Sequence, residues 1–113
     1  MKNLIKSISS KGISSVKGLA LVSDTSYEVI FYGIINGKTI QSNTMVEEDL
    51  IDSVFLDKIY NDIASCIKKT SDYDNNKLNI VEFNDNGIVS HKKENRDYSV
   101  YKVIKEWEKN IGQ

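Results

Sequence analysis

The sequence contains one histidine, His91, which is the residue type that most often serves as a general base or a metal ligand. A general base needs an orienting partner, and a zinc site needs two or three further ligands. The sequence supplies neither pattern near His91, and its neighbours Lys92 and Lys93 would repel a metal ion. At the end of a predicted hairpin strand, His91 is therefore expected to be a solvated surface residue.

Cys66 is the only cysteine and hence the only candidate thiol nucleophile. A reactive thiolate requires a helix N-terminus or a neighbouring cation that lowers its pKa. Cys66 falls between Ile63 and Ile67, near the C-terminal end of a predicted helix and on its apolar side. This position predicts a buried structural thiol. Because a lone cysteine has no internal disulfide partner, it also indicates a reducing compartment.

Acidic residues are the remaining candidates for chemistry. Helical spacing would spread Glu47, Glu48, Asp49 and Asp52 around the helix, so they would not converge on a metal ion. The polar loop 72–76 lacks the glycine and the bidentate acid of a calcium-binding loop. The sequence also lacks a glycine-rich phosphate loop, zinc-type ligand spacing and a Ser/His/Asp arrangement. It therefore predicts a protein that is not an enzyme and that binds neither metal nor cofactor.

A long helix is predicted from Thr44 to Lys69, beginning with a Thr44–Glu47 capping box. If this helix is continuous, Leu50, Val54, Asp57 and Asn61 lie within a 60° arc, opposite a broad apolar face. Such a line of residues could bind a partner. In the alternative interpretation the helix breaks near Asp52-Ser53, and Leu50 and Val54 belong to the core of a bent segment.

The other elements follow from hydrophobic periodicity and turn residues. The fold class is predicted to be α+β, with about five mostly antiparallel strands packed against two or three helices in the order α-β-β-β-α-β-β-α. Asn36-Gly37 is a strong hairpin signal. The elements other than the long helix are expected at residues 2–10 (helix), 18–23, 27–35, 38–43, 77–83 and 88–92 (strands) and 97–110 (helix).

Size and charge restrict the class of protein further. The chain of 113 residues is expected to form a single domain, 1–113, and its net charge of −1 gives no general attraction to nucleic acid or to acidic membranes. The charge is uneven, because residues 46–65 carry six acidic residues and one lysine. The N-terminus does not have the pattern of a signal peptide, and no apolar run is long enough to cross a bilayer. These features predict a cytoplasmic protein.

The chain as a whole resembles the immunity proteins of bacterial toxin–immunity pairs, such as those of contact-dependent growth inhibition. It shares with them an α+β layout, the Asn36-Gly37 hairpin, an acidic 44–69 helix and a final helix that carries Trp107. It also has no proline and is rich in Asn, Lys and Ile. The resemblance implies a non-enzymatic inhibitor that occludes one cognate toxin domain, often a nuclease with a basic substrate surface.

An acidic helix can steer association with such a basic domain. The residues expected to bind the partner are Glu47, Asp49, Leu50, Val54, Asp57, Asn61 and Asp62. The chain is expected to be a monomer or a small homo-oligomer. The alternative function is a secretion chaperone or an adaptor subunit of a larger bacterial assembly, which would bind an extended peptide.

Overall fold

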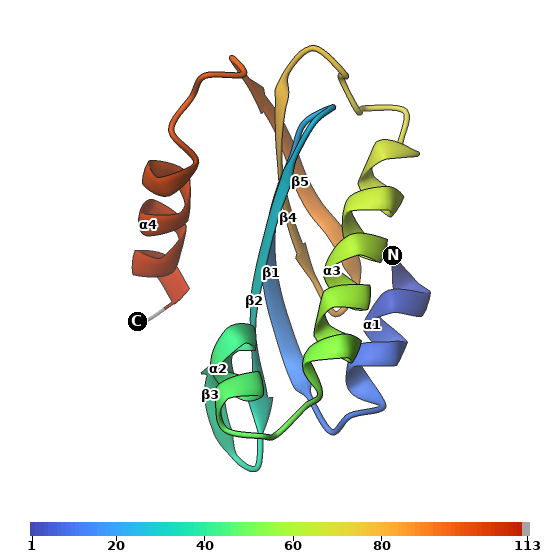
Figure 1. Cartoon of the computed structure of the whole chain (residues 1–113), viewed down its shortest axis with the longest axis vertical. Coiled ribbons are helices and arrows are strands. Elements are labelled where there is room, and N and C mark those ends of the chain that lie inside the picture. The colour runs from blue at the N-terminus through green and yellow to red at the C-terminus, as the bar shows by residue number, and fades with distance from the viewer. Residues whose placement is uncertain (112–113) are drawn as a thin grey trace.

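The computed structural model describes residues 1–111, which form an antiparallel sheet with helices on both faces (Figure 1). The elements in chain order are α1 (Lys2–Ser9), β1 (Ser14–Val22), β2 (Tyr27–Ile35), β3 (Lys38–Gln41), α2 (Ser42–Glu47), α3 (Ser53–Lys68), β4 (Leu78–Asn84), β5 (Gly87–Glu94) and α4 (Val100–Ile111).

The strands have the order β3-β2-β1-β4-β5, and every neighbouring pair is antiparallel. β1 is therefore the central strand, and the chain reaches its other side only after passing through α2 and α3. The predicted α+β class and element order are confirmed. Residues 1–111 contain four helices instead of the predicted two or three, because the predicted long helix is divided.

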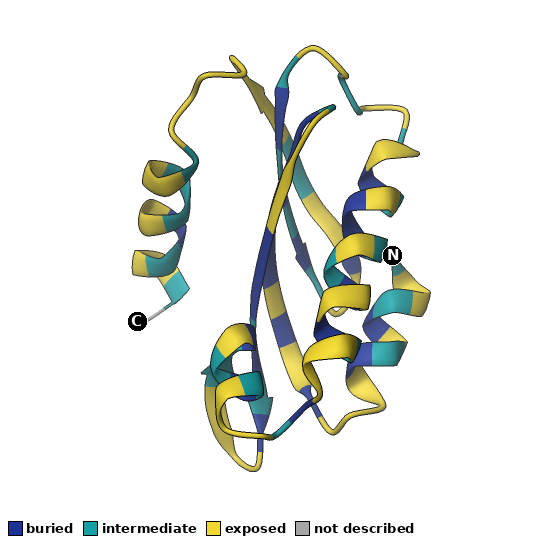
Figure 2. Ribbon diagram, in the orientation of Figure 1, coloured by how far each residue is buried: buried dark blue, intermediate teal, exposed yellow. Residues whose placement is uncertain are grey.

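The two faces of the sheet are covered unequally. α1 and α3 lie against one face, α2 lies near the β2–β3 end, and α4 alone lies against the other face (Figure 1). The strands of the sheet contain many buried residues (Figure 2), and the buried apolar side chains form two separate clusters. The sheet thus separates a larger core from a smaller one.

The hairpin predicted at Asn36-Gly37 is confirmed. Both residues have positive φ angles, 53° and 78°, and Ile35 pairs directly with Lys38. Two consecutive positive φ angles are the signature of the tight turn that Asn-Gly favours between twisted strands.

The first strand begins at Ser14, four residues earlier than predicted, because the serines before Gly18 belong to the strand and not to a turn. An irregularity in pairing between Ser14 and Lys17, with Ser15 at φ 52°, marks this end of β1. Within β1, Gly18 leaves room for the ring of Phe83. A Cβ atom at Gly18 would lie only 2.0 Å from Phe83 Cζ.

The predicted helix at 44–69 breaks before Ser53, as the alternative interpretation held, but the placement of Val54 in the core is wrong, because its side chain is 71% exposed. α2 ends at Glu47, the chain turns through residues 48–52, and α3 begins at Ser53. The Asp49 φ angle of 57° and the bonds from the Leu50 and Ile51 N–H groups to the Met45 carbonyl define the turn. Ile51 in this turn is buried in the larger core.

The predicted capping box is wrong, because Thr44 lies inside α2. The side chain that caps α2 is Gln41, whose Oε1 accepts the Asn43 N–H at 2.8 Å. The cap of α3 is Asp52, whose Oδ1 accepts the Val54 N–H at 3.2 Å.

Alanine substitutions at Asp52 and Thr44 distinguish a residue that caps a helix from one that lies inside a helix. Asp52→Ala should lower the free energy of unfolding by about 1 kcal/mol, because it removes an N-cap. Thr44→Ala should change it by less than about 0.5 kcal/mol, because no cap is lost. Urea denaturation of both variants measures the difference. A larger loss for Thr44→Ala would contradict the observed position of the break.

Candidate protein-binding face

The residues predicted to bind a partner lie on α2, the turn after it and the outer side of α3. Glu47 and Asp49 are exposed at the end of α2 and in the turn. On α3, Asp57 and Asn61 are also exposed, and the Val54 side chain is 71% exposed. We call Glu47, Asp49, Val54, Asp57 and Asn61 the acidic face.

The helix break removes Leu50 from this line of residues. Leu50 lies in the turn, is half-buried and packs against the larger core. A continuous helix would have placed it one turn before Val54 on the same side, and this alignment is wrong. Val54 is therefore the exposed apolar side chain that α3 presents among acidic residues.

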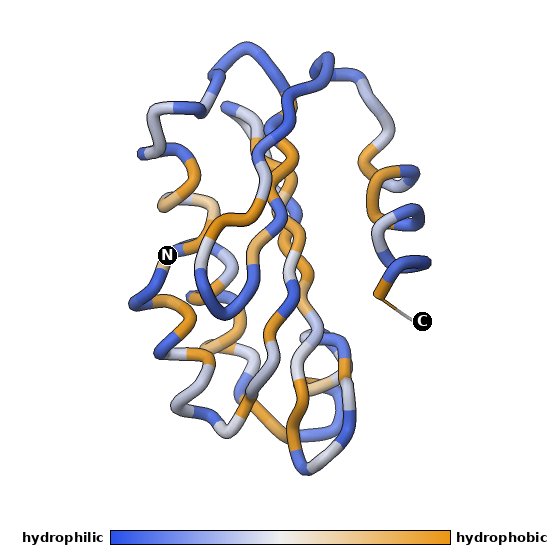
Figure 3. Tube along the Cα trace, turned by 180° about the vertical axis from the view of Figure 1, so that it is seen from behind, coloured by the Kyte–Doolittle hydropathy of each residue, from blue (hydrophilic) through white to orange (hydrophobic). Residues whose placement is uncertain are grey.

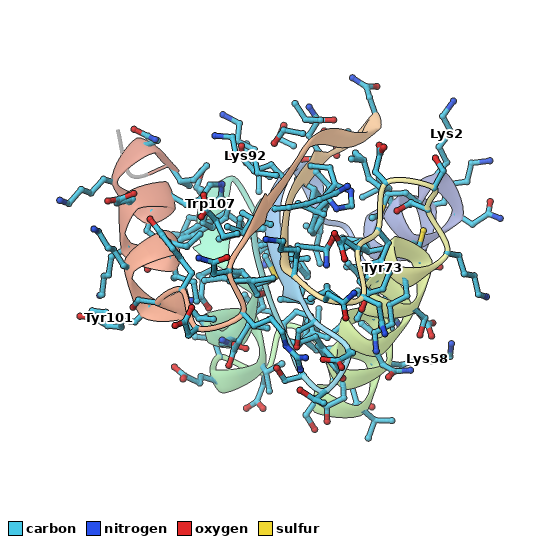
Figure 4. The ribbon with its side chains drawn as sticks, turned by 90° about the horizontal axis from the view of Figure 1, so that it is seen from above. Lys2, Lys58, Tyr73, Lys92, Tyr101 and Trp107 are labelled. Atoms are coloured by element: carbon cyan, nitrogen blue, oxygen red, sulfur yellow. The ribbon has the colours of Figure 1, made fainter. Side chains whose placement is uncertain are left out.

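Asp62 differs from the other predicted acids because its charge is paired. Its Oδ2 accepts a bond from Lys58 Nζ at 2.7 Å, one helical turn away. Figure 4 shows Lys58 extending from α3 toward solvent. An exposed i,i+4 pair adds only about 0.3–0.5 kcal/mol of stability. Its main effect here is to neutralise the one lysine of the 46–65 segment.

The inner side of α3 is fixed by apolar packing. Leu56, Ile59 and Ile63 are buried against the sheet. The Phe31 and Tyr60 rings meet edge to face with their centroids 6.2 Å apart. This packing orients the helix so that Val54 and Asp57 point away from the core.

A chain of hydrogen bonds joins α3 to α2 and β2. The Phe31 N–H donates to Ser42 Oγ at 3.2 Å, Ser42 Oγ bonds Tyr60 Oη, and Tyr60 Oη donates to Asn43 Oδ1 at 3.1 Å. Since the single Tyr60 hydroxyl proton goes to Asn43, Ser42 must be the donor to Tyr60. These bonds hold the two helices of the acidic face in a fixed relation.

The Tyr60 hydroxyl stays protonated in this network. Burial raises the pKa of Tyr60 to about 12, the bond from Ser42 opposes the rise, and the charges of Glu28 and Asp57 add to it. The protonated hydroxyl can therefore keep donating to Asn43 over the physiological pH range.

His91 is more constrained than predicted, because it is half-buried and bonded to the fully buried Asn79. Its Nε2 lies 2.9 Å from Asn79 Oδ1, which also accepts the Asp74 N–H at 3.0 Å. The Asn79 amide group donates to three backbone carbonyl groups, including that of Val22 at 3.1 Å. These partners fix the amide orientation, so His91 Nε2 must carry a proton.

Asn79 was not singled out in the sequence, although it carries a usable signal. It interrupts the apolar face that Val81 and Phe83 continue in the same strand. A buried asparagine in such a position must satisfy its polar atoms, and here it ties the α3–β4 loop to β1 and β5. Figure 3 shows that the loops at this end of the molecule are hydrophilic.

Cys66 is half-buried, so the prediction of a buried thiol is wrong. It lies on the side of α3 that meets the start of α1, where its Sγ is 3.4 Å from the Met1 ammonium nitrogen. The inward positions beside it are taken by Ile63 and Ile67, which are fully buried.

His91 should make stability depend on pH. Burial lowers its pKa, Asp72 opposes this and Lys93 adds to it. Folding therefore favours the neutral ring, and stability should fall as the pH drops below about 6.5, the pKa of an unfolded histidine.

The variant His91→Gln tests this pH dependence. Its side-chain amide supplies an N–H donor in place of the His91 ring, but glutamine does not titrate. The difference in unfolding free energy between wild type and variant should decrease from pH 7 to pH 5. A constant difference, or a His91 pKa above 6.5 by NMR, would contradict this assignment.

Within residues 1–111, no group of three or more His, Cys, Asp and Glu side chains could hold a metal ion. No helix in the same range is long and apolar enough to cross a membrane. Comparisons of the chain with protein-family models, with curated proteins and with solved structures found no match.

Proposed function

We propose that this protein is a non-enzymatic binding protein whose acidic face docks onto a basic protein domain. The observation that carries the proposal is the 71% exposure of Val54 at the start of α3, among exposed Glu47, Asp49 and Asp57. A single exposed valine is ordinary on a protein surface. On α3 its neighbours one turn further along are Asp57 and Lys58, and the Lys58 charge is paired with Asp62, so Val54 offers an apolar contact on a surface that favours a partner of opposite charge.

Electrostatics support a basic partner. Five exposed carboxylates occupy the segment from α2 to the first turns of α3, namely Glu47, Glu48, Asp49, Asp52 and Asp57. Lys58, the one cation of the segment, is already paired with Asp62. Unpaired charge of one sign raises the rate of encounter with an oppositely charged surface and disfavours acidic partners.

The rigidity of the face supports specific binding. The Phe31–Ser42–Tyr60–Asn43 bonds and the buried inner side of α3 leave little backbone to order when a partner binds. Less ordering means a smaller entropic cost of association. Such a surface suits a folded partner domain better than a flexible one.

A toxin domain is the partner class that we propose. Nuclease toxins bind polyanionic substrates on basic surfaces, and an acidic helix placed there would exclude the substrate. This agrees with the resemblance of the chain to bacterial immunity proteins. The inhibitor would act by occlusion in the cell that produces the toxin, without chemistry of its own.

A second candidate is a chaperone or adaptor that binds an extended peptide. The observation that favours it is the edge strand β5, where Ile88 is 39% exposed and Val89 62% exposed. An extended peptide could add to this edge as a further strand. Lys92, Lys93 and the irregular pairing near Phe83 oppose it, because natural proteins use such features to block edge pairing.

Charge reversal tests the acidic face. The triple variant Glu47→Lys, Asp49→Lys and Asp57→Lys should slow association with the cognate basic domain, strongly at low salt and less at high salt. Steering charges act mainly on the association rate and are screened by ions. Surface plasmon resonance at two ionic strengths measures the rates.

A matched control variant has the same net charge as the first triple variant, but its three charge reversals lie elsewhere on the surface. Glu94→Lys, Asp97→Lys and Glu106→Lys reverse three exposed acids on β5, the following loop and α4. This variant should slow association much less. Equal effects of the two triple variants would show that net charge matters and that the acidic face does not.

The apolar contact is tested by Val54→Asn, which removes the apolar side chain without adding charge to the acidic face. Because Val54 is exposed, the substitution should leave the unfolding free energy within about 0.5 kcal/mol of wild type. Binding should weaken by about 1–3 kcal/mol, mostly through faster dissociation. Unchanged dissociation of a folded variant would place the interface elsewhere.

A further inference from the structure

The single helix on the second face of the sheet covers a small, separate core. Its buried members are Leu19, Leu21, Ile30, Leu78 and Trp107. The larger core has eighteen buried residues and lies between the sheet and α1, α2 and α3. Figure 1 shows α4 apart from the other helices, joined to the sheet through the loop after β5.

α4 is too narrow to cover the face on which it lies. Five strands spaced about 4.8 Å apart span roughly 20 Å, whereas a helix with its side chains is about 10 Å wide. α4 packs mainly against β1, the central strand. The outer strands therefore remain partly open on this face.

Hollows follow both sides of α4. One of about 170 Å³ lies toward β5 and is lined by Leu19, Ile80, Val103 and Trp107, among others. Another of about 220 Å³ lies toward β3 and is lined by Tyr32, Ile34, Thr39 and Ile111, among others. The helix thus packs along one line and lacks neighbours on its flanks.

α4 is held by one apolar stripe, in which half-buried Val100, Val103, Ile104 and Ile111 pack beside Trp107 against the small core. Trp107 is its only buried residue in the part of the chain that the structure describes, and it points toward the sheet while Tyr101 points away (Figure 4). Tyr32 Oη donates to Glu108 Oε2 at 2.7 Å, and the Tyr32 and Trp107 ring centroids lie 5.9 Å apart. A second tether, the Arg96–Asp24 ion pair, holds the preceding loop.

The loop between β5 and α4 can act as a hinge. Its residues, 95–99, are all exposed. Its local bonds, from the Tyr98 N–H to the Asn95 carbonyl and from the Lys102 N–H to Ser99 Oγ, lie within the loop and the first turn of α4. Lifting α4 would break no hydrogen bond between strands.

We propose that α4 is a lid that opens as a unit while the sheet and the larger core stay folded. Opening removes the contacts of the small core and the Tyr32–Glu108 tether. It leaves the pairing of β1 with β2 and β4 intact, so it costs less free energy than global unfolding. The open state exposes a continuous apolar face made by Leu19, Leu21, Ile30, Leu78 and Ile80, which the closed lid conceals. This device is independent of the proposed partner and of the acidic face.

Native-state hydrogen exchange on the purified full chain tests the lid. In increasing urea, the amides of α4 should exchange through an opening with a small urea dependence. The amides of β1 should exchange only by global unfolding, with a larger dependence, because that dependence scales with the surface exposed. Trp107, the only tryptophan, should report the first transition by fluorescence. Identical opening free energies and urea dependences for α4 and β1 would overturn the proposal.

Two matched tyrosine variants make the test sharper. Tyr32→Phe removes the tether and should speed α4 exchange about ten-fold, which corresponds to 1.4 kcal/mol. Tyr60→Phe removes a comparable hydrogen bond on the opposite face and should speed exchange in β1 while leaving α4 unchanged. If Tyr60→Phe accelerates α4 as much as β1, the two belong to one cooperative unit and the lid does not exist. If α4 amides of wild type exchange without protection, the helix is not a closed lid and the proposal also fails.

Discussion

The structure depends on the burial of β1 on both faces. Leu19 and Leu21 point into the small core, while Ala20 and Val22 point into the large one. A strand that is apolar on both sides is stable only when helices cover both faces of its sheet. The chain meets this requirement with α1 and α3 on one side and with α4 on the other. Because these helices cover the faces unequally, the two sides of the molecule have different properties.

The periodicity of the sequence was sufficient to predict most of the fold. β2 has the predicted bounds, since alternating apolar residues and the Asn36-Gly37 turn define both its face and its end. The division of the long helix could not be decided in the same way. Thr44 with Glu47 and Asp52 before Ser53 are both good local start signals. The chain uses the Asp52 signal and buries Ile51, in the turn before it, in the large core, so the choice depends on tertiary packing.

The candidate site was predictable only where it depends on helical geometry. Val54, Asp57 and Asn61 share an exposed side of α3 because their spacing follows the helix period, whatever lies beneath. Leu50 left that line when the helix broke. Asn79 and His91 illustrate the opposite case, since their bonding depends on the Val22 carbonyl and the Asp74 backbone. These groups are distant in sequence from His91, and no local pattern places them beside it.

The unequal covering of the sheet separates two tasks that would otherwise conflict. A surface that binds a folded partner selectively benefits from a fixed backbone, and the acidic face lies on the side with two packed helices and the Ser42–Tyr60 bonds. A segment that opens needs few contacts, and α4 lies on the side with a small core and hollows on both flanks. Because the sheet stands between them, loosening α4 leaves the packing under α3 intact. Among the described residues, β1, β2 and β4 each contribute buried apolar residues to both cores, and β1 contributes the most, three to the large core and two to the small one. A change on one face would therefore reach the other through these three inner strands, which have side chains in both cores.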